Sequence, residues 1–142
     1  MSQTRPKRTT LTLIGWKEDV HLPELRIAAM VAKIDTGARS SALHAEEIRI
    51  KGRNVSFRIG SKSHKMKLAG SKRIKSSNGH SEMRPMIETA IMLGEQHFVC
   101  AITLTDRADM GVPMLLGREA IKGRFLVNAA RTFILSRKAK AQ

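Results

Sequence analysis

Hydrophobic and polar residues alternate along much of this chain, and a period of two is typical of strands with one buried face. Val55, Phe57 and Ile59 fall on one side of such a strand, and polar or basic residues fall on the other. Residues 84–104 alternate in the same way, with a predicted hairpin turn at 94–96. We expect strands at residues 10–22, 26–35, 54–60, 63–70, 84–93, 97–104, 112–117, 124–128 and 131–136.

Sustained helical periodicity is almost absent from the sequence. Only residues 118–123 predict a single helical turn, which Gly123 would end because glycine accepts a left-handed backbone. Many short strands with few helices favour a mainly β fold. We therefore predict a small closed β-barrel with one short helix near the C-terminus, rather than layers of helices and sheet.

The length of 142 residues suits one domain with a modest core. We assign residues 11–136 to the barrel and residues 1–10 and 137–142 to basic tails, which we expect to be disordered. Cys100 is the only cysteine, which excludes an internal disulfide and a cysteine-based tetrahedral zinc site. No apolar run approaches the roughly 20 residues that span a bilayer. These features predict a soluble, cytoplasmic protein with no membrane partner.

The net charge is strongly positive, because 26 Lys and Arg against 12 Asp and Glu give a formal +14. The excess is concentrated in residues 48–81, which contain ten basic residues and no acidic one. Such a segment is either a solvated surface or an electrostatic funnel for nucleic acid or an acidic peptide. The ten residues are Arg49, Lys51, Arg53, Arg58, Lys62, Lys65, Lys67, Lys72, Arg73 and Lys75.

The segment KIDTGARSSALHA, residues 33–45, places Asp35, Thr36 and Gly37 directly after an apolar strand. Asp-Thr-Gly is ordinary turn chemistry, but it is also the way to hold a catalytic carboxylate at a strand end. In a two-carboxylate mechanism the carboxyl groups lie about 3 Å apart and share a proton. Asp106 and Asp109 are not followed by Thr-Gly or Ser-Gly. If the chemistry is aspartic, a homodimer would therefore bring two copies of Asp35 together on its axis.

The Asp-Thr-Gly turn and the later segment MLLGREAI, residues 114–121, together resemble one half of a retroviral-type aspartic protease. Residues 22–45, 74–87 and 104–128 also resemble a bacterial family labelled ATP-dependent zinc proteases. The resemblance implies a retropepsin-like barrel, a functional link to ATP-grasp ligases that add glutamate to protein tails, and a hydroxyl of Thr36 that reaches across the dimer axis. It also implies that Arg118 braces the barrel. Gly37 would adopt a backbone conformation that a Cβ forbids.

Several residues near Asp35 are candidates for substrate contact. Ala38 and Arg39 follow the Asp-Thr-Gly turn, and the guanidinium of Arg39 is either a surface group or a fork for a substrate carboxylate. The polar segment 76–85 falls where a retropepsin flap would lie, and it is either a plain loop or a substrate contact. Its candidates are Ser76, Ser77, Asn78 and Arg84.

No metal or cofactor is predicted. The five histidines are dispersed, no His-Glu-x-x-His occurs, and the sequence shows no local set of three or four converging ligands. No Gly-x-x-x-x-Gly-Lys loop is present to bind ATP phosphates. The ATP in the family's label would therefore belong to the neighbouring ligase.

Two classes of function remain open at this point. The first is a homodimeric aspartic peptidase that trims acidic, glutamate-extended protein tails. The second is a non-catalytic basic barrel that binds RNA or the ribosome. The motifs favour the peptidase, and the absence of tyrosine weakens the RNA interpretation because few rings are left to stack on bases.

Overall fold

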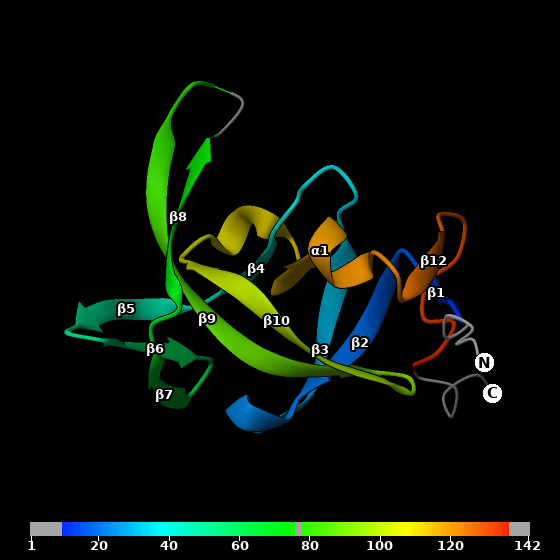
Figure 1. Cartoon of the computed structure of the whole chain (residues 1–142), viewed down its shortest axis with the longest axis horizontal. Helices are drawn as coiled ribbons and strands as arrows, with labels where there is room; N and C mark the ends of the chain where they lie inside the picture. The colour runs from blue at the N-terminus through cyan, green and yellow to red at the C-terminus, as the bar shows by residue number, and fades with distance from the viewer. Residues whose placement is uncertain (1–9, 76–77, 137–142) are drawn as a thin grey trace, which may run out of the picture.

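The computed structural model describes residues 10–75 and 78–136, and it confirms the mainly β fold class (Figure 1). Basic tails 1–9 and 137–142 lie outside the described residues, as do Ser76 and Ser77. No helix in the described ranges is long and apolar enough to cross a membrane. The strands are β1 Thr12–Gly15, β2 Lys17–Leu22, β3 Ile27–Ile34, β4 Ser41–His44, β5 Glu46–Lys51, β6 Asn54–Ile59, β7 Lys62–Lys67, β8 Gly70–Lys75, β9 Ser81–Leu93, β10 Gln96–Thr105, β11 Met114–Leu116 and β12 Phe125–Asn128. The helical pieces are α1 Arg118–Ile121 and the 3₁₀ turns Pro23–Leu25 and Ala108–Met110.

Six strands close into a barrel. They follow the order β10-β4-β11-β3-β2-β9, and antiparallel pairing of β9 with β10 closes the ring. The inward residues of these strands form the core, because alternate residues of each strand point to the same face. Leu22, Leu43, Ile91, Ile102 and Leu116 are among those that are fully buried there. The predicted closed barrel is therefore confirmed.

Two further parts extend from the barrel (Figure 1). β8 pairs antiparallel with the first half of β9 and forms an arm that stands out from the barrel. β5, β6 and β7 form a separate antiparallel sheet at one end of the molecule. Val55 and Phe57 on β6 are buried, so one face of this small sheet packs on the core and the other faces solvent.

The predicted strand at residues 131–136 is wrong. This segment forms no strand, and its backbone N–H groups bind a buried carboxylate in place of a neighbouring strand. Glu18 on β2 is fully buried, and its oxygens accept from the N–H groups of Gly15, Ile134 and Ser136 at 2.8, 2.8 and 3.1 Å and from the Ser136 hydroxyl at 2.7 Å. A buried carboxylate needs such donors, and here they fix residues 134–136 against the barrel.

Several strand boundaries also differ from the prediction. The expected strand at 10–22 is divided into β1 and β2, and β4, β5 and β8 were not predicted. β9 begins at Ser81, so half of the expected polar loop at 76–85 belongs to a strand. The helical turn over 118–121 is confirmed, and Gly123 after it has a left-handed φ of +79°.

Candidate active site

Asp35 lies at the end of β3, on a turn that is fixed by backbone hydrogen bonds. β3 runs parallel to β11, and the N–H of Asp35 donates to the carbonyl of Leu116 at 2.8 Å. The N–H of Gly37 donates to the Asp35 carboxylate at 3.1 Å, and the N–H of Ala38 donates to the Asp35 carbonyl at 3.2 Å. Asp35 is half-buried, and these bonds hold its turn at the end of β3.

The expected reason for a glycine at position 37 is wrong. Gly37 does not have a left-handed φ, and a Cβ built there would touch only the Asp35 carboxylate, at 3.4 Å. The crowded glycine is Gly117, where a Cβ would lie 2.5 Å from the carbonyl oxygen of Ser40. Gly117 thus permits the close approach of two backbone segments beside the site.

The start of α1 braces the loop that carries Asp35. The N–H of Arg118 donates to the carbonyl of Ala38 at 2.8 Å, and its guanidinium donates to the carbonyl of Thr36 at 3.1 Å. The N–H of Glu119 donates to the carbonyl of Arg39 at 3.1 Å. These contacts agree with the bracing role expected of Arg118. Thr36 is exposed.

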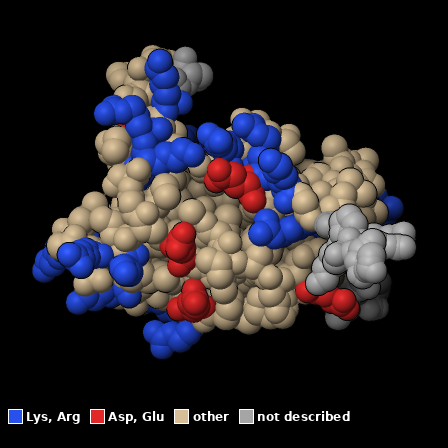
Figure 2. Space-filling model, in the orientation of Figure 1, with Lys and Arg blue, Asp and Glu red and all other residues tan. Residues whose placement is uncertain are grey.

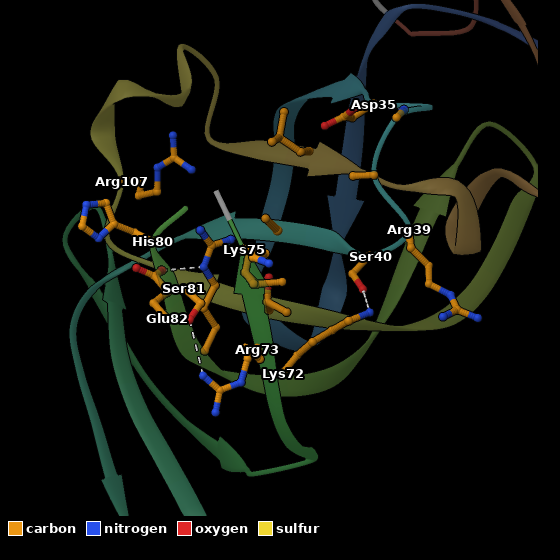
Figure 3. A pocket seen from close by; sticks show the side chains of 17 residues that line it. Asp35, Arg39, Ser40, Lys72, Arg73, Lys75, His80, Ser81, Glu82 and Arg107 are labelled. Atoms are coloured by element: carbon orange, nitrogen blue, oxygen red, sulfur yellow. Dashed lines mark hydrogen bonds and ion pairs between the residues drawn. The ribbon is translucent and has the colours of Figure 1, made fainter. Parts of the chain in front are cut away.

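A cavity of about 600 Å³ opens beside Asp35, between the barrel mouth and the β8–β9 arm (Figure 3). Of the predicted substrate residues, Ala38, Arg39 and Arg84 line it, whereas Asn78 does not. Ser76 and Ser77 lie outside the described residues. The basic side chains on its wall are Arg39, Lys72, Arg73, Lys75, Arg84 and Arg107, and the two carboxylates are Asp35 and Glu82.

A polar contact ties the arm to the loop after Asp35. Lys72 on β8 donates to the hydroxyl of Ser40, and Figure 3 marks this contact with a dashed line. Within the arm, the guanidinium of Arg73 lies 3.4 Å from the hydroxyl of Ser81. Cations of β8 therefore lie opposite the carboxylate of Asp35, across the space that a substrate would occupy.

Arg84 is not on an exposed loop, contrary to one of the two expectations. It lies on β9 with its side chain only 10% exposed, and its Nε donates to Glu82 at 2.5 Å. This hydrogen bond lowers the pKa of Glu82, and the positive charges of Arg84 and Arg107 and a hydrogen bond from Thr105 act in the same direction against a smaller effect of burial. Glu82 is therefore a stable carboxylate at neutral pH, and it is already neutralised by a neighbour.

The sequence did not identify several residues of the cavity wall. Glu82, Ser40 and Arg107 were not candidates, and Lys72 was known only as part of the basic segment. Arg107 comes to the site because β10 pairs parallel with β4, a long-range contact without a local sequence signal. Asp109, at 3.3 Å from Arg107, does not line the cavity.

The pairing of β10 with β4 also brings together three possible metal ligands, which their spacing in the sequence did not reveal. Atoms of His44, Glu46 and Asp106 lie within 4.8 Å of one another. The arrangement does not fit zinc, because Nδ1 of His44 accepts the N–H of Arg107 at 3.1 Å, which places the ring proton on Nε2. That proton faces Glu46, which is also held by Arg58 at 2.7 Å.

Comparison with known protein families gives one match over most of the chain. Residues 13–138 match the family described as RimB-like, "Retropepsin-like aspartic endopeptidase RimB".

Curated relatives carry a different name. A "Probable alpha-L-glutamate ligase" of Shewanella pealeana is 39% identical over 138 residues, which cover 89% of this chain and 30% of that protein. Another of the same name, from Desulfotalea psychrophila, is 32% identical over 142 residues, which cover 92% of this chain and 30% of that protein. The chain thus spans about 30% of the length of these relatives.

A solved structure shares the fold over nearly its whole length. It is a Legionella pneumophila protein of unknown function, 29% identical, with a TM-score of 0.74. The match covers 89% of this chain and 99% of that one.

Proposed function

Because this chain belongs to the RimB-like family of retropepsin-like aspartic endopeptidases, we propose that it is an aspartic peptidase of acidic protein tails. It acts as a homodimer in the cytoplasm, and its substrates carry glutamate-extended ends. The observation that carries the proposal is the position of Asp35 in a cavity that six basic side chains line.

The charge of the cavity supports an acidic substrate. Against six basic residues stand two carboxylates, of which Glu82 is already held by Arg84 at 2.5 Å. Such a wall attracts carboxylates, and guanidinium groups bind them through paired hydrogen bonds. Arg39 suits this role, because its contact with Glu119 is long, at 3.5 Å, and both side chains are more than half exposed. An exposed pair of this kind is weak enough to exchange for a substrate carboxylate.

The chemistry requires a second carboxylate beside Asp35. Glu82 is a poor candidate, because its low pKa keeps it from holding the proton that the two groups must share. In a symmetric dimer, Asp35 of one protomer would meet Asp35 of its partner. One carboxylate then takes a proton from the attacking water, and the other, protonated, donates to the scissile carbonyl.

The names of the relatives support a link to glutamate addition. They are called glutamate ligases, whereas this chain matches only 30% of their length. We propose that the shared part contributes a peptidase that acts on the product of an ATP-grasp glutamate ligase.

The test measures peptide cleavage against protein concentration, with a glutamate-rich peptide and a neutral peptide of equal length. Activity per protomer should rise with concentration as dimers form, and light scattering should show the dimer over the same range. A monomer with full activity would contradict the two-carboxylate mechanism.

Arg39→Ala provides the test of substrate charge. It should weaken binding of the acidic peptide by about tenfold to a hundredfold, as the loss of a charge-assisted hydrogen bond predicts. Binding of the neutral peptide should change far less. Arg131→Ala is the matched control, because Arg131 is exposed and lies outside the cavity wall. Equal effects of both variants on both peptides would exclude Arg39 from substrate recognition.

A further inference from the structure

The outer face of the β5–β6–β7 sheet carries a regular array of positive charge that the proposed peptidase does not use. Cross-strand pairing aligns Arg49 with Ser56 and Lys65, and Lys51 with Asn54 and Lys67. Residues in register on neighbouring strands share a face. Arg49, Lys51, Lys65 and Lys67 therefore stand on one face, two on each outer strand. None of these side chains lines the cavity beside Asp35.

The four side chains are exposed and their charge is not neutralised locally. No ion pair or side-chain hydrogen bond engages them within residues 10–75 and 78–136. The acidic residues on β5, Glu46 and Glu47, both lie against Arg58, at 2.7 and 3.8 Å. Figure 2 shows Lys and Arg gathered over the end of the molecule where Figure 1 places this sheet.

The geometry of the array is that of a flat polar platform. The outer strands lie about 10 Å apart, and successive residues on one face of a strand lie about 7 Å apart. Ser56 and Asn54, small and polar, occupy the middle strand between the charges. The exposed face therefore presents four cations at the corners of a rectangle, without an aromatic side chain. A pocket of about 340 Å³ lies at the Lys67 corner and is also lined by Glu88.

We propose that this face, the β5–β7 platform, binds the phosphate backbone of a double-stranded nucleic acid without reading its sequence. A stiff duplex presents regularly spaced charge in advance and releases condensed counterions when cations replace them. A flexible acidic peptide would lose conformational freedom when it binds this face, whereas a stiff duplex loses little. Single strands fit less well, because their proteins stack bases on aromatic rings. The platform would thus hold the peptidase on a nucleic acid while the cavity remains open.

The test compares two variants of the full chain that lose the same charge. The platform variant is Lys51→Gln, Lys65→Gln and Lys67→Gln. The control variant is Lys33→Gln, Lys122→Gln and Arg131→Gln, which are exposed residues outside both the platform and the cavity wall. The basic residues at both chain ends are present in both variants, so their contribution cancels. Binding is measured on a short RNA duplex, the matching DNA duplex and the matching single strand, between about 50 and 200 mM salt.

The platform variant should bind both duplexes more weakly, and its slope of log affinity against log salt should be less steep by about 2–3 than that of the unaltered chain. The control variant should change the slope by less than about 1. Equal losses of duplex affinity in both variants would mean that binding depends only on net charge, and this would overturn the proposal. Unchanged duplex binding with weaker binding of a poly-glutamate peptide would assign the platform to an acidic protein and overturn it as well.

Peptide cleavage by the platform variant separates this proposal from the proposed function. Cleavage should equal that of the unaltered chain, because no substituted residue lines the cavity. If the unaltered chain cleaves no peptide, the duplex result still decides the role of the platform.

Discussion

Glu18→Gln removes one charged oxygen from the buried group that fixes residues 131–136 to the barrel. Oε2 of Glu18 accepts from Gly15 and Ile134, both at 2.8 Å, and Oε1 accepts from the backbone and the hydroxyl of Ser136 at 3.1 and 2.7 Å. A glutamine amide in place of Oε1 would face the Ser136 N–H, which then loses its acceptor. The hydroxyl can rotate and accept from the amide, so the backbone donor bears most of the change.

The expected loss follows from these contacts. One buried donor without a partner costs about 1–3 kcal/mol, and the remaining bonds lose the strengthening that a charged acceptor gives. We expect the free energy of unfolding to fall by about 2–4 kcal/mol in total. For a domain of this size the melting temperature should then fall by roughly 6–12 °C.

Urea unfolding and thermal melting measure the effect, with Glu24→Gln as the matched control. Glu24 is exposed and accepts from the Thr89 hydroxyl at 2.9 Å and the Ala90 N–H at 3.1 Å. Both donors bind one oxygen of Glu24, Oε1, and the glutamine amide keeps an oxygen that can accept both bonds. This substitution should therefore cost less than about 1 kcal/mol. Equal losses in the two variants would refute the role of Glu18 as a buried anchor.

Three further outcomes are expected. Gly117→Ala should destabilise the fold by about 1–3 kcal/mol in thermal melting, because its Cβ would meet the Ser40 carbonyl at 2.5 Å, whereas Gly37→Ala should melt like the unaltered chain. Burial raises the pKa of the Cys100 thiol, so its reaction with a thiol reagent at neutral pH should be slow until the chain unfolds, and rapid labelling of the folded protein would contradict this. Peptide cleavage should survive a strong chelator, since the donors around His44 do not fit zinc; a loss that zinc alone restores would show the opposite.

The sequence was most informative where a pattern was local and its burial regular. Val55 and Phe57 alternate on β6 and are buried as predicted, and the Asp-Thr-Gly turn follows an apolar strand as expected. The family resemblance, drawn from the same motifs, is confirmed by the match over residues 13–138. Closed-barrel topology followed from the number of short strands, which leave few other ways to bury one face of each.

Strands that depend on pairing rather than burial were missed. β8 carries one apolar side chain, Ile74, and is held by its register with β9, so its sequence shows no alternation. The opposite error occurred at residues 131–136, where Phe133, Ile134 and Leu135 suggested a strand. The partner of that segment is the Glu18 carboxylate, and a side chain distant in sequence leaves no periodic signal.

The cavity was only partly predictable for the same reason. Ala38, Arg39 and Arg84 were identified as candidates and do line it, but Arg107 and Glu82 reach it through the pairing of β10 with β4 and the length of β9. Asn78 was a candidate and lies off the cavity wall. Long-range pairing thus decides which charges surround Asp35.

The most direct test of the account is cleavage of a glutamate-tailed protein by Asp35→Asn. The substitution keeps the size of the side chain and removes both the general base and the shared proton, so the rate should fall by at least about a hundredfold. Thermal melting and binding of the tail should remain as in the unaltered chain. Asp106→Asn is the control. Asp106 does not line the cavity, so this variant should cleave the substrate at the rate of the unaltered chain. If Asp35→Asn cleaves as fast as the unaltered chain, Asp35 is only a turn residue and the proposed mechanism is wrong.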